Sequence, residues 1–233
     1  MRGFFITGTD TGVGKTLVAA GLLRIFAATG LRTVGMKPVA SGASRTTVGL
    51  RNADALVLQA ASSATRPYDE VNPYVFSPAI APHLAAAEAG VTIELSRILT
   101  TYLRLCAEAD VVVVEGVGGW QVPLSDDLQL PDLARALGLP VILVVGLRLG
   151  CLNHAQLSAR AIREDGLILA GWVANAINSD FERCAENLAT LKQVMQAPLL
   201  GEIPWRSEII AEDAGESLDA TSIFKLLNSA QAE

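Results

Sequence analysis

The fold of this chain is indicated by the stretch Gly8-Thr9-Asp10-Thr11-Gly12-Val13-Gly14-Lys15-Thr16, a glycine-rich turn that ends in Gly-Lys-Thr. Residues 4–7 before it, Phe-Phe-Ile-Thr, are typical of a short buried strand, and residues 15–28 after it are rich in Ala and Leu, as in a helix. In that setting the backbone N–H groups and the helix N-terminus bind phosphate, Lys15 reaches the terminal phosphates and Thr16 can bind Mg²⁺. The general spacing would place the first glycine at Thr9, one position later than Gly8. The stretch predicts a phosphate loop.

Composition favours a single α/β domain over residues 1–233. The chain has 233 residues, of which 51% are hydrophobic and 18% charged, enough to bury one large core. No repeat, linker or low-complexity segment divides it. A formal net charge of −6 argues against nucleic-acid binding, which requires a basic face.

The cysteine spacing predicts neither a zinc site nor a disulfide framework. Cys106, Cys151 and Cys184 are far apart and form no CxxC or Cys/His pattern. No signal-peptide pattern precedes the phosphate loop, and no stretch reaches the roughly 20 apolar residues of a membrane helix. We therefore expect a cytoplasmic protein with no membrane partner.

Short runs of Val, Ile and Leu alternate with longer segments of helical period, which is typical of a parallel sheet covered on both faces. The sequence thus predicts a doubly wound, mainly parallel phosphate-loop fold. The predicted strands are residues 4–7, 33–37, 111–115, 141–145, 169–175 and 199–203. The predicted helices are residues 15–28, 53–61, 93–108, 130–137, 152–165, 181–195 and 220–227.

Polar residues close several of these strands, at the sheet edge where open α/β folds bind ligands. Lys37 precedes Pro38, which ends the strand, and its ammonium could neutralise an anionic substrate or a transferring phosphoryl group. The alternative is a solvated lysine at the edge of the sheet. Ser41 follows in a turn, where its hydroxyl could position a substrate.

Glu115 ends the apolar run of residues 111–114, as the metal-binding acid does in phosphate-loop enzymes. Together with Thr16 it is a candidate Mg²⁺ ligand, because Mg²⁺ prefers oxygen. Asp54 could supply a second carboxylate, although acids at helix starts are commonly caps.

Two further segments could bind polar groups of a ligand: Asn175, at the end of another predicted strand, and the start of the predicted helix that follows Gly150. Asn175 could bind the N6/N7 edge of adenine, or simply form a turn. The helix start after Gly150 has free N–H groups that could bind a carboxylate. His83 and His154 have no partner at a recognisable spacing and are expected to be structural.

Several segments together resemble the ATP-dependent dethiobiotin synthetase family, over nearly the whole chain; residues 207–233 match least. The shifted first glycine is usual for that family. The matching segments are residues 7–16, Met36-Lys37-Pro38-Val39-Ala40-Ser41-Gly42, Val114-Glu115-Gly116-Val117-Gly118-Gly119-Trp120, Leu149-Gly150-Cys151-Leu152-Asn153-His154 and Gly201-Glu202-Ile203-Pro204-Trp205.

The resemblance implies a homodimeric enzyme of biotin synthesis that converts 7,8-diaminononanoate, CO₂ (or bicarbonate) and ATP, with Mg²⁺, into dethiobiotin. The nucleotide-binding residues that it implies are Gly12, Val13, Gly14, Lys15, Thr16, Leu17, Asp54, Glu115, Gly116, Val117, Gly118, Asn175, Ala176, Pro204, Trp205 and Arg206. The other roles that it implies are catalysis by Lys37, Lys15 and Thr11, Mg²⁺ binding by Thr16, Asp54 and Glu115, and substrate binding by Ser41 and by Gly150, Cys151, Leu152 and Asn153, the last four from the other subunit.

One position departs from that family, and the chain differs from two other classes of phosphate-loop protein. Ala81 stands where a small hydroxyl residue is common. A partitioning-type ATPase switch usually has a lysine five positions before the phosphate-loop lysine, where this chain has Asp10. A cobalamin-type amidotransferase needs an additional glutamine-hydrolysing region with a Cys/His pair.

Overall fold

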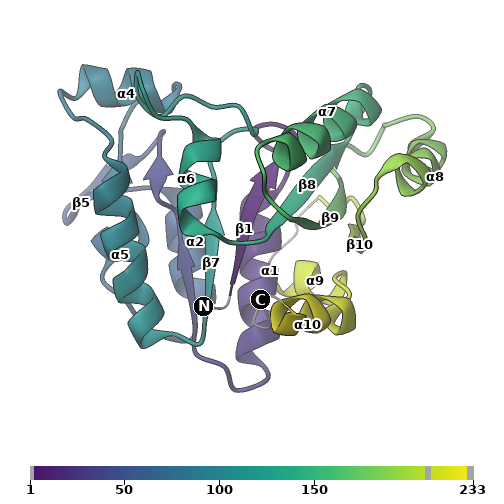
Figure 1. Cartoon of the computed structure of the whole chain (residues 1–233), viewed down its shortest axis with the longest axis horizontal. Coiled ribbons are helices and arrows are strands. Elements are labelled where there is room, and N and C mark those ends of the chain that lie inside the picture. Colours follow the sequence, from purple (N-terminus) through teal and green to yellow (C-terminus); the bar gives the residue numbers. More distant parts are fainter. Residues whose placement is uncertain (1–2, 208–210, 230–233) are drawn as a thin grey trace.

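The computed structural model describes residues 3–207 and 211–229. Its centre is a sheet of six strands in the order β10-β9-β8-β1-β7-β2, and every neighbouring pair is parallel (Figure 1). All six predicted strands are present, with ends within two residues of prediction. Their bounds are β1 Gly3–Gly8, β2 Thr33–Met36, β7 Val111–Glu115, β8 Val141–Leu147, β9 Leu169–Ala176 and β10 Leu199–Ile203.

Helices cover both faces of this sheet, which confirms the doubly wound fold. The side chains of α5, α6 and α7 form one core cluster with one face of the sheet, and those of α1, α2 and α10 form another with the opposite face (Figure 1). The helices are α1 Lys15–Ala27, α2 Ala53–Ala61, α3 Tyr68–Val71, α4 Pro82–Glu88, α5 Leu95–Glu108, α6 Leu130–Leu137, α7 Cys151–Glu164, α8 Cys184–Val194, α9 Ala211–Glu216 and α10 Ala220–Ser229.

Successive residues of β1 belong to opposite cores. Phe4 and Ile6 pack with α1, whereas Phe5 lies in the cluster that includes α5 and α6. Successive side chains of a strand point to opposite faces of the sheet, so a strand covered on both faces is apolar throughout. This is why the strands read as unbroken runs of Val, Ile and Phe.

Some elements escaped the sequence analysis because they are too short to show a period. These are β3 Val39–Ala40, paired with β6 Tyr74–Val75, the hairpin of β4 Ser44–Thr46 and β5 Gly49–Arg51, and the helices α3, α4 and α9. The predicted start of α8 at residue 181 was wrong, since Arg183 has a left-handed φ of 58° and the helix begins after it. The start of α5 was two residues early.

Local chemistry explains several helix ends. Asn52 caps α2 by accepting the N–H of Ala55. A reciprocal capping box of Gln129 and Asp132 begins α6, and Gly138 ends it with a left-handed φ of 64°. None of the described helices is long and apolar enough to cross a membrane.

Candidate functional site

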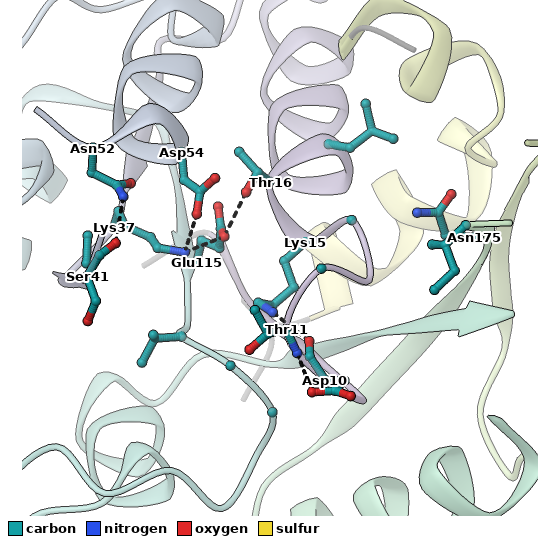
Figure 2. Close-up of a pocket in the computed structure, with 18 of the residues that line it drawn as sticks. Asp10, Thr11, Lys15, Thr16, Lys37, Ser41, Asn52, Asp54, Glu115 and Asn175 are labelled. Carbon is teal, nitrogen blue, oxygen red and sulfur yellow. Dashed lines mark hydrogen bonds and ion pairs between the residues drawn. The ribbon is translucent and has the colours of Figure 1, made fainter. Parts of the chain in front are cut away.

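A cleft of about 1040 Å³ lies at the carboxyl ends of the parallel strands, where β1, β2, β7 and β9 lead into their loops (Figure 2). It thus lies at the sheet edge expected from the sequence. It is lined by Asp10, Thr11, Gly12, Gly14, Lys15, Thr16, Leu17, Lys37, Ala40, Ser41, Asn52, Asp54, Ala79, Ile80, Ala81, Pro82, Glu115, Val117, Gly118, Gly119, Val122, Asn175, Ala176, Ile177, Pro204, Trp205 and Arg206.

The phosphate loop has the conformation that its glycines permit. Gly14 has a left-handed φ of 94° directly before α1, and a Cβ there would lie 2.2 Å from the Asn175 amide nitrogen. Both facts require glycine. The Asn175 amide also donates to the Val13 carbonyl at 2.9 Å. Asn175 therefore supports the loop from β9, a role that the sequence analysis did not foresee.

Lys15 folds over its own loop. Its Nζ donates to the Asp10 carbonyl at 2.9 Å (Figure 2). Burial, and secondarily the charge of Lys37, lower the pKa of the Lys15 ammonium to about 8. A polyphosphate in the cleft would offset both effects, because its negative charge favours the protonated lysine.

Lys37 meets two carboxylates at the centre of the cleft. Its Nζ lies 2.5 Å from Glu115 Oε1 and 3.2 Å from Asp54 Oδ2, and it donates to the Gly116 carbonyl at 3.1 Å (Figure 2). Burial alone would lower the pKa of Lys37, but Glu115 and Asp54 outweigh it and hold the pKa above its ordinary value. Lys37 is thus a buried, charged group inside the cleft rather than a solvated edge residue.

The residues proposed as Mg²⁺ ligands converge beside this lysine. Thr16 Oγ1 donates to Glu115 Oε1 at 2.9 Å, and Asp54 faces the same point from the first turn of α2 (Figure 2). Glu115 is 1% exposed, and its second oxygen has no hydrogen-bond partner among the described residues. A hydroxyl, two carboxylates and an unsatisfied oxygen fit a hard cation such as Mg²⁺. The helix cap that could have explained Asp54 is Asn52 instead.

The Asp10 side chain links the phosphate loop to the segment that follows β8. Its carboxylate accepts the Thr11 N–H at 2.7 Å and forms an ion pair with Arg148, the residue that follows β8. The Thr11 hydrogen bond, the largest influence, and Arg148 together lower the pKa of Asp10. This carboxylate therefore stays charged and holds the loop to the turn that starts α7.

The far end of the cleft contains the residues expected to contact the base. Asn175, Ala176, Pro204, Trp205 and Arg206 all line it, beyond the phosphate loop. With its Nδ2 on Val13, the Asn175 side chain keeps Oδ1 as the atom that could accept a hydrogen bond from a base.

Some predicted site residues lie elsewhere. Gly150, Cys151, Leu152 and Asn153 lie at the start of α7 and do not line this cleft. Their role in another subunit stays a prediction. Val13 is buried in the core that contains α1, and Gly116 faces the cleft region through its carbonyl.

The sequence analysis missed other residues that line or brace the cleft. Ala79, Ile80 and Pro82 follow no recognisable motif. Asn52 could have been found from its place before the helix at residue 53, a position that favours Asn. Ala81 lines the same cleft, as does Ser41, whose hydroxyl has no hydrogen-bond partner within the described part of the chain.

The six-stranded parallel sheet and the loop around Lys15 define a phosphate-loop nucleotide-binding protein. A family model described as "AAA domain" matches residues 2–213. An ATP-dependent dethiobiotin synthetase BioD of Pseudomonas aeruginosa is 53% identical, covering 94% of this chain and 96% of that protein. Its counterpart in Xanthomonas oryzae pv. oryzae is 52% identical, covering 92% and 96%. The chain belongs to the ATP-dependent dethiobiotin synthetase family.

Solved structures confirm the fold alone. The MinC:MinD cell division protein complex of Aquifex aeolicus aligns with a TM-score of 0.57 at 14% identity, covering 100% of this chain and 97% of that one. A ParA family ATPase from Chlorobium tepidum TLS gives 0.56 at 14% identity, covering 100% and 99%. At the position where the partitioning-type ATPases were expected to have lysine, this chain has Asp10, paired with Arg148.

Proposed function

We propose that this chain uses ATP and CO₂ to close 7,8-diaminononanoate into the cyclic urea dethiobiotin, releasing ADP and phosphate. One observation supports it above all. The Lys37 ammonium lies 2.5 Å from Glu115 and 3.2 Å from Asp54 in the cleft that also contains the phosphate loop. A buried cation beside a phosphate site suits the activation of an anionic carbamate.

The reaction divides into three steps. One amine of the diamine attacks CO₂ and loses a proton, giving a carbamate. A carbamate oxygen then attacks the γ-phosphorus of ATP, forming a carbamic–phosphoric anhydride as ADP departs. The second amine attacks the carbamoyl carbon, the C–O bond to phosphate breaks, and loss of a proton leaves the five-membered urea. Because both amines belong to one bound molecule, the closure is intramolecular.

The cleft residues have separate parts in this scheme. Lys37 stabilises the carbamate and the transferring phosphoryl group, and Lys15 moves from the Asp10 carbonyl to the ATP phosphates. Thr11 and Ser41 orient the diamine and the carbamate. The Ser41 hydroxyl is buried with no hydrogen-bond partner among the described residues, which supports a ligand-binding role.

Mg²⁺ belongs to the proposal. When bound, it would be held by Thr16, Asp54 and Glu115 and would neutralise phosphate oxygens. Glu115 and Asp54, the carboxylates that pair with Lys37, thus also supply the oxygen ligands that the Mg²⁺ bound with ATP would need.

The remaining parts concern the nucleotide and the assembly. Asn175 and residues 204–206 receive the adenine. The chain forms a homodimer in the cytoplasm, in which the start of α7 from one subunit binds the substrate carboxylate of the other. The N-terminus of the 14-residue helix α7, which follows the left-handed Gly150 and has no side-chain cap among the described residues, supports the carboxylate site.

The test supplies purified protein with the diamine, bicarbonate, ATP and Mg²⁺. Mass spectrometry should detect the urea, with one ADP and one phosphate formed for each product molecule. ATP hydrolysis that proceeds equally without the diamine would contradict the proposal. Light scattering measures the mass in solution and checks the dimer.

A further inference from the structure

A largely buried hydrogen-bond network reaches the wall of the cleft at Asn52 and contains none of the residues proposed to touch substrate. Its members are Asn52, Tyr68 and Asn72. The two asparagines are only 6% and 2% exposed. Buried amides require hydrogen-bond partners, and the partners of these two asparagines determine their geometry.

The orientation of every group in this network is fixed by its neighbours. Asn72 Nδ2 donates to two carbonyls, those of Lys37 at 2.6 Å and Tyr74 at 3.0 Å. Asn72 Oδ1 must then accept, and it receives the Tyr68 hydroxyl at 2.9 Å. The Tyr68 oxygen in turn accepts the backbone N–H of Asn52 at 2.7 Å. Only a protonated hydroxyl satisfies both neighbours.

The environment of Tyr68 keeps that hydroxyl protonated and its ring in place. Burial raises the pKa of the phenol. The Arg51 guanidinium lies 4.1 Å from the ring centroid, a cation–π contact that holds the ring face.

The network joins the segment that bears Lys37 to the helix that bears Asp54, two parts of the cleft that the central sheet does not connect. On one side α3 binds the backbone of Lys37, through the Val71 carbonyl at 2.8 Å and through Asn72. On the other side Asn52 caps α2, the helix that presents Asp54. The side-chain Nδ2 of Asn52 also donates to the Ser41 carbonyl at 3.1 Å (Figure 2).

We propose that Tyr68 is a positioning residue of the ring-closing reaction, whose hydroxyl sets Lys37 against Asp54 and Ser41. The inference rests on the proposed function. Tyr68 touches neither substrate nor nucleotide. It acts because β2 ends at Met36, so the segment that bears Lys37 is held by α3 rather than by the central sheet.

The test compares two Tyr→Phe variants. Tyr68→Phe keeps the ring under Arg51 but removes the hydroxyl from Asn52 and Asn72. Tyr74→Phe is a matched control, because Tyr74 also lies under an arginine, with the Arg97 guanidinium 4.6 Å from its ring centroid, and also accepts a backbone N–H, that of Glu94 at 2.9 Å.

For Tyr68→Phe we expect kcat to fall about 10- to 100-fold, the scale of a misplacement of about 1 Å. The Kd for ATP should stay within about twofold, because the network does not touch the phosphate loop; twofold is about 0.4 kcal/mol. Tyr74→Phe should keep the wild-type kcat while losing similar stability to urea. Should Tyr68→Phe not fold, Asn72→Ser leaves an acceptor near the hydroxyl but cannot reach the Lys37 carbonyl, and should show the same loss of kcat.

Two results would overturn the inference: an unchanged kcat in Tyr68→Phe or in its substitute, or equal losses of kcat in the Tyr68 and Tyr74 variants. Absence of a urea product from the wild-type chain would instead contradict the proposed function, and this inference with it. Product from the wild type together with either of the first two results contradicts the positioning role alone.

Discussion

Replacing Lys37 by Met should destabilise the protein as well as inactivate it. Glu115 is 1% exposed, and Lys37→Met would leave its carboxylate buried without its cation. Breaking such a pair by removing one partner costs about 3–5 kcal/mol. The Asp54 side chain is 46% exposed, so losing that contact adds only about 0–1 kcal/mol.

A double-mutant cycle isolates the cause. Adding Glu115→Gln to Lys37→Met removes the stranded charge, so the double variant should recover most of the lost stability. Asp54→Asn is the control, because it removes a carboxylate of the cleft that is already screened by water. It should lower the free energy of unfolding by about 1 kcal/mol or less.

The assay is equilibrium urea unfolding with EDTA present, so that no divalent cation replaces the lysine. An unchanged m-value with a lower midpoint reports a true loss of stability. The reasoning is refuted if Lys37→Met costs less than about 1 kcal/mol, or if adding Glu115→Gln destabilises it further.

Glu115→Gln alone should raise the Mg²⁺ concentration for half-maximal turnover, by about tenfold if one ligand contributes about 1.4 kcal/mol; an unchanged metal titration would count against ligation. Asn175→Ala removes the hydrogen bond to Val13 as well as the proposed base contact and should weaken ATP binding about 3- to 30-fold by calorimetry, the equivalent of one or two hydrogen bonds; unaltered affinity would exclude both roles. Gly35→Ala would place a Cβ 2.8 Å from that of Leu58 and should cost about 1–3 kcal/mol in urea unfolding, whereas full stability would show that α2 can move away from β2.

Local pattern determined the framework of this protein. Turn chemistry and period act over a few residues, so the glycines before Lys15 and the apolar run that ends at Glu115 identified a phosphate loop and a buried strand closed by an acid. All six strands of the main sheet followed from such runs. The strand ends also indicated Lys37 and Asn175, because the carboxyl ends of parallel strands share one edge.

Only the tertiary structure decided what those residues do to one another. Lys37 and Glu115 are 78 positions apart, and Asn175 and Val13 are 162 apart. Their contacts depend on strand order and on how short elements pack, which no local period encodes. Tyr68 shows this most clearly. It is an unremarkable residue in the sequence. The positioning role that we propose for it arises because the fold places its hydroxyl between the backbone N–H of Asn52 and the side chain of Asn72, which each support a different part of the cleft.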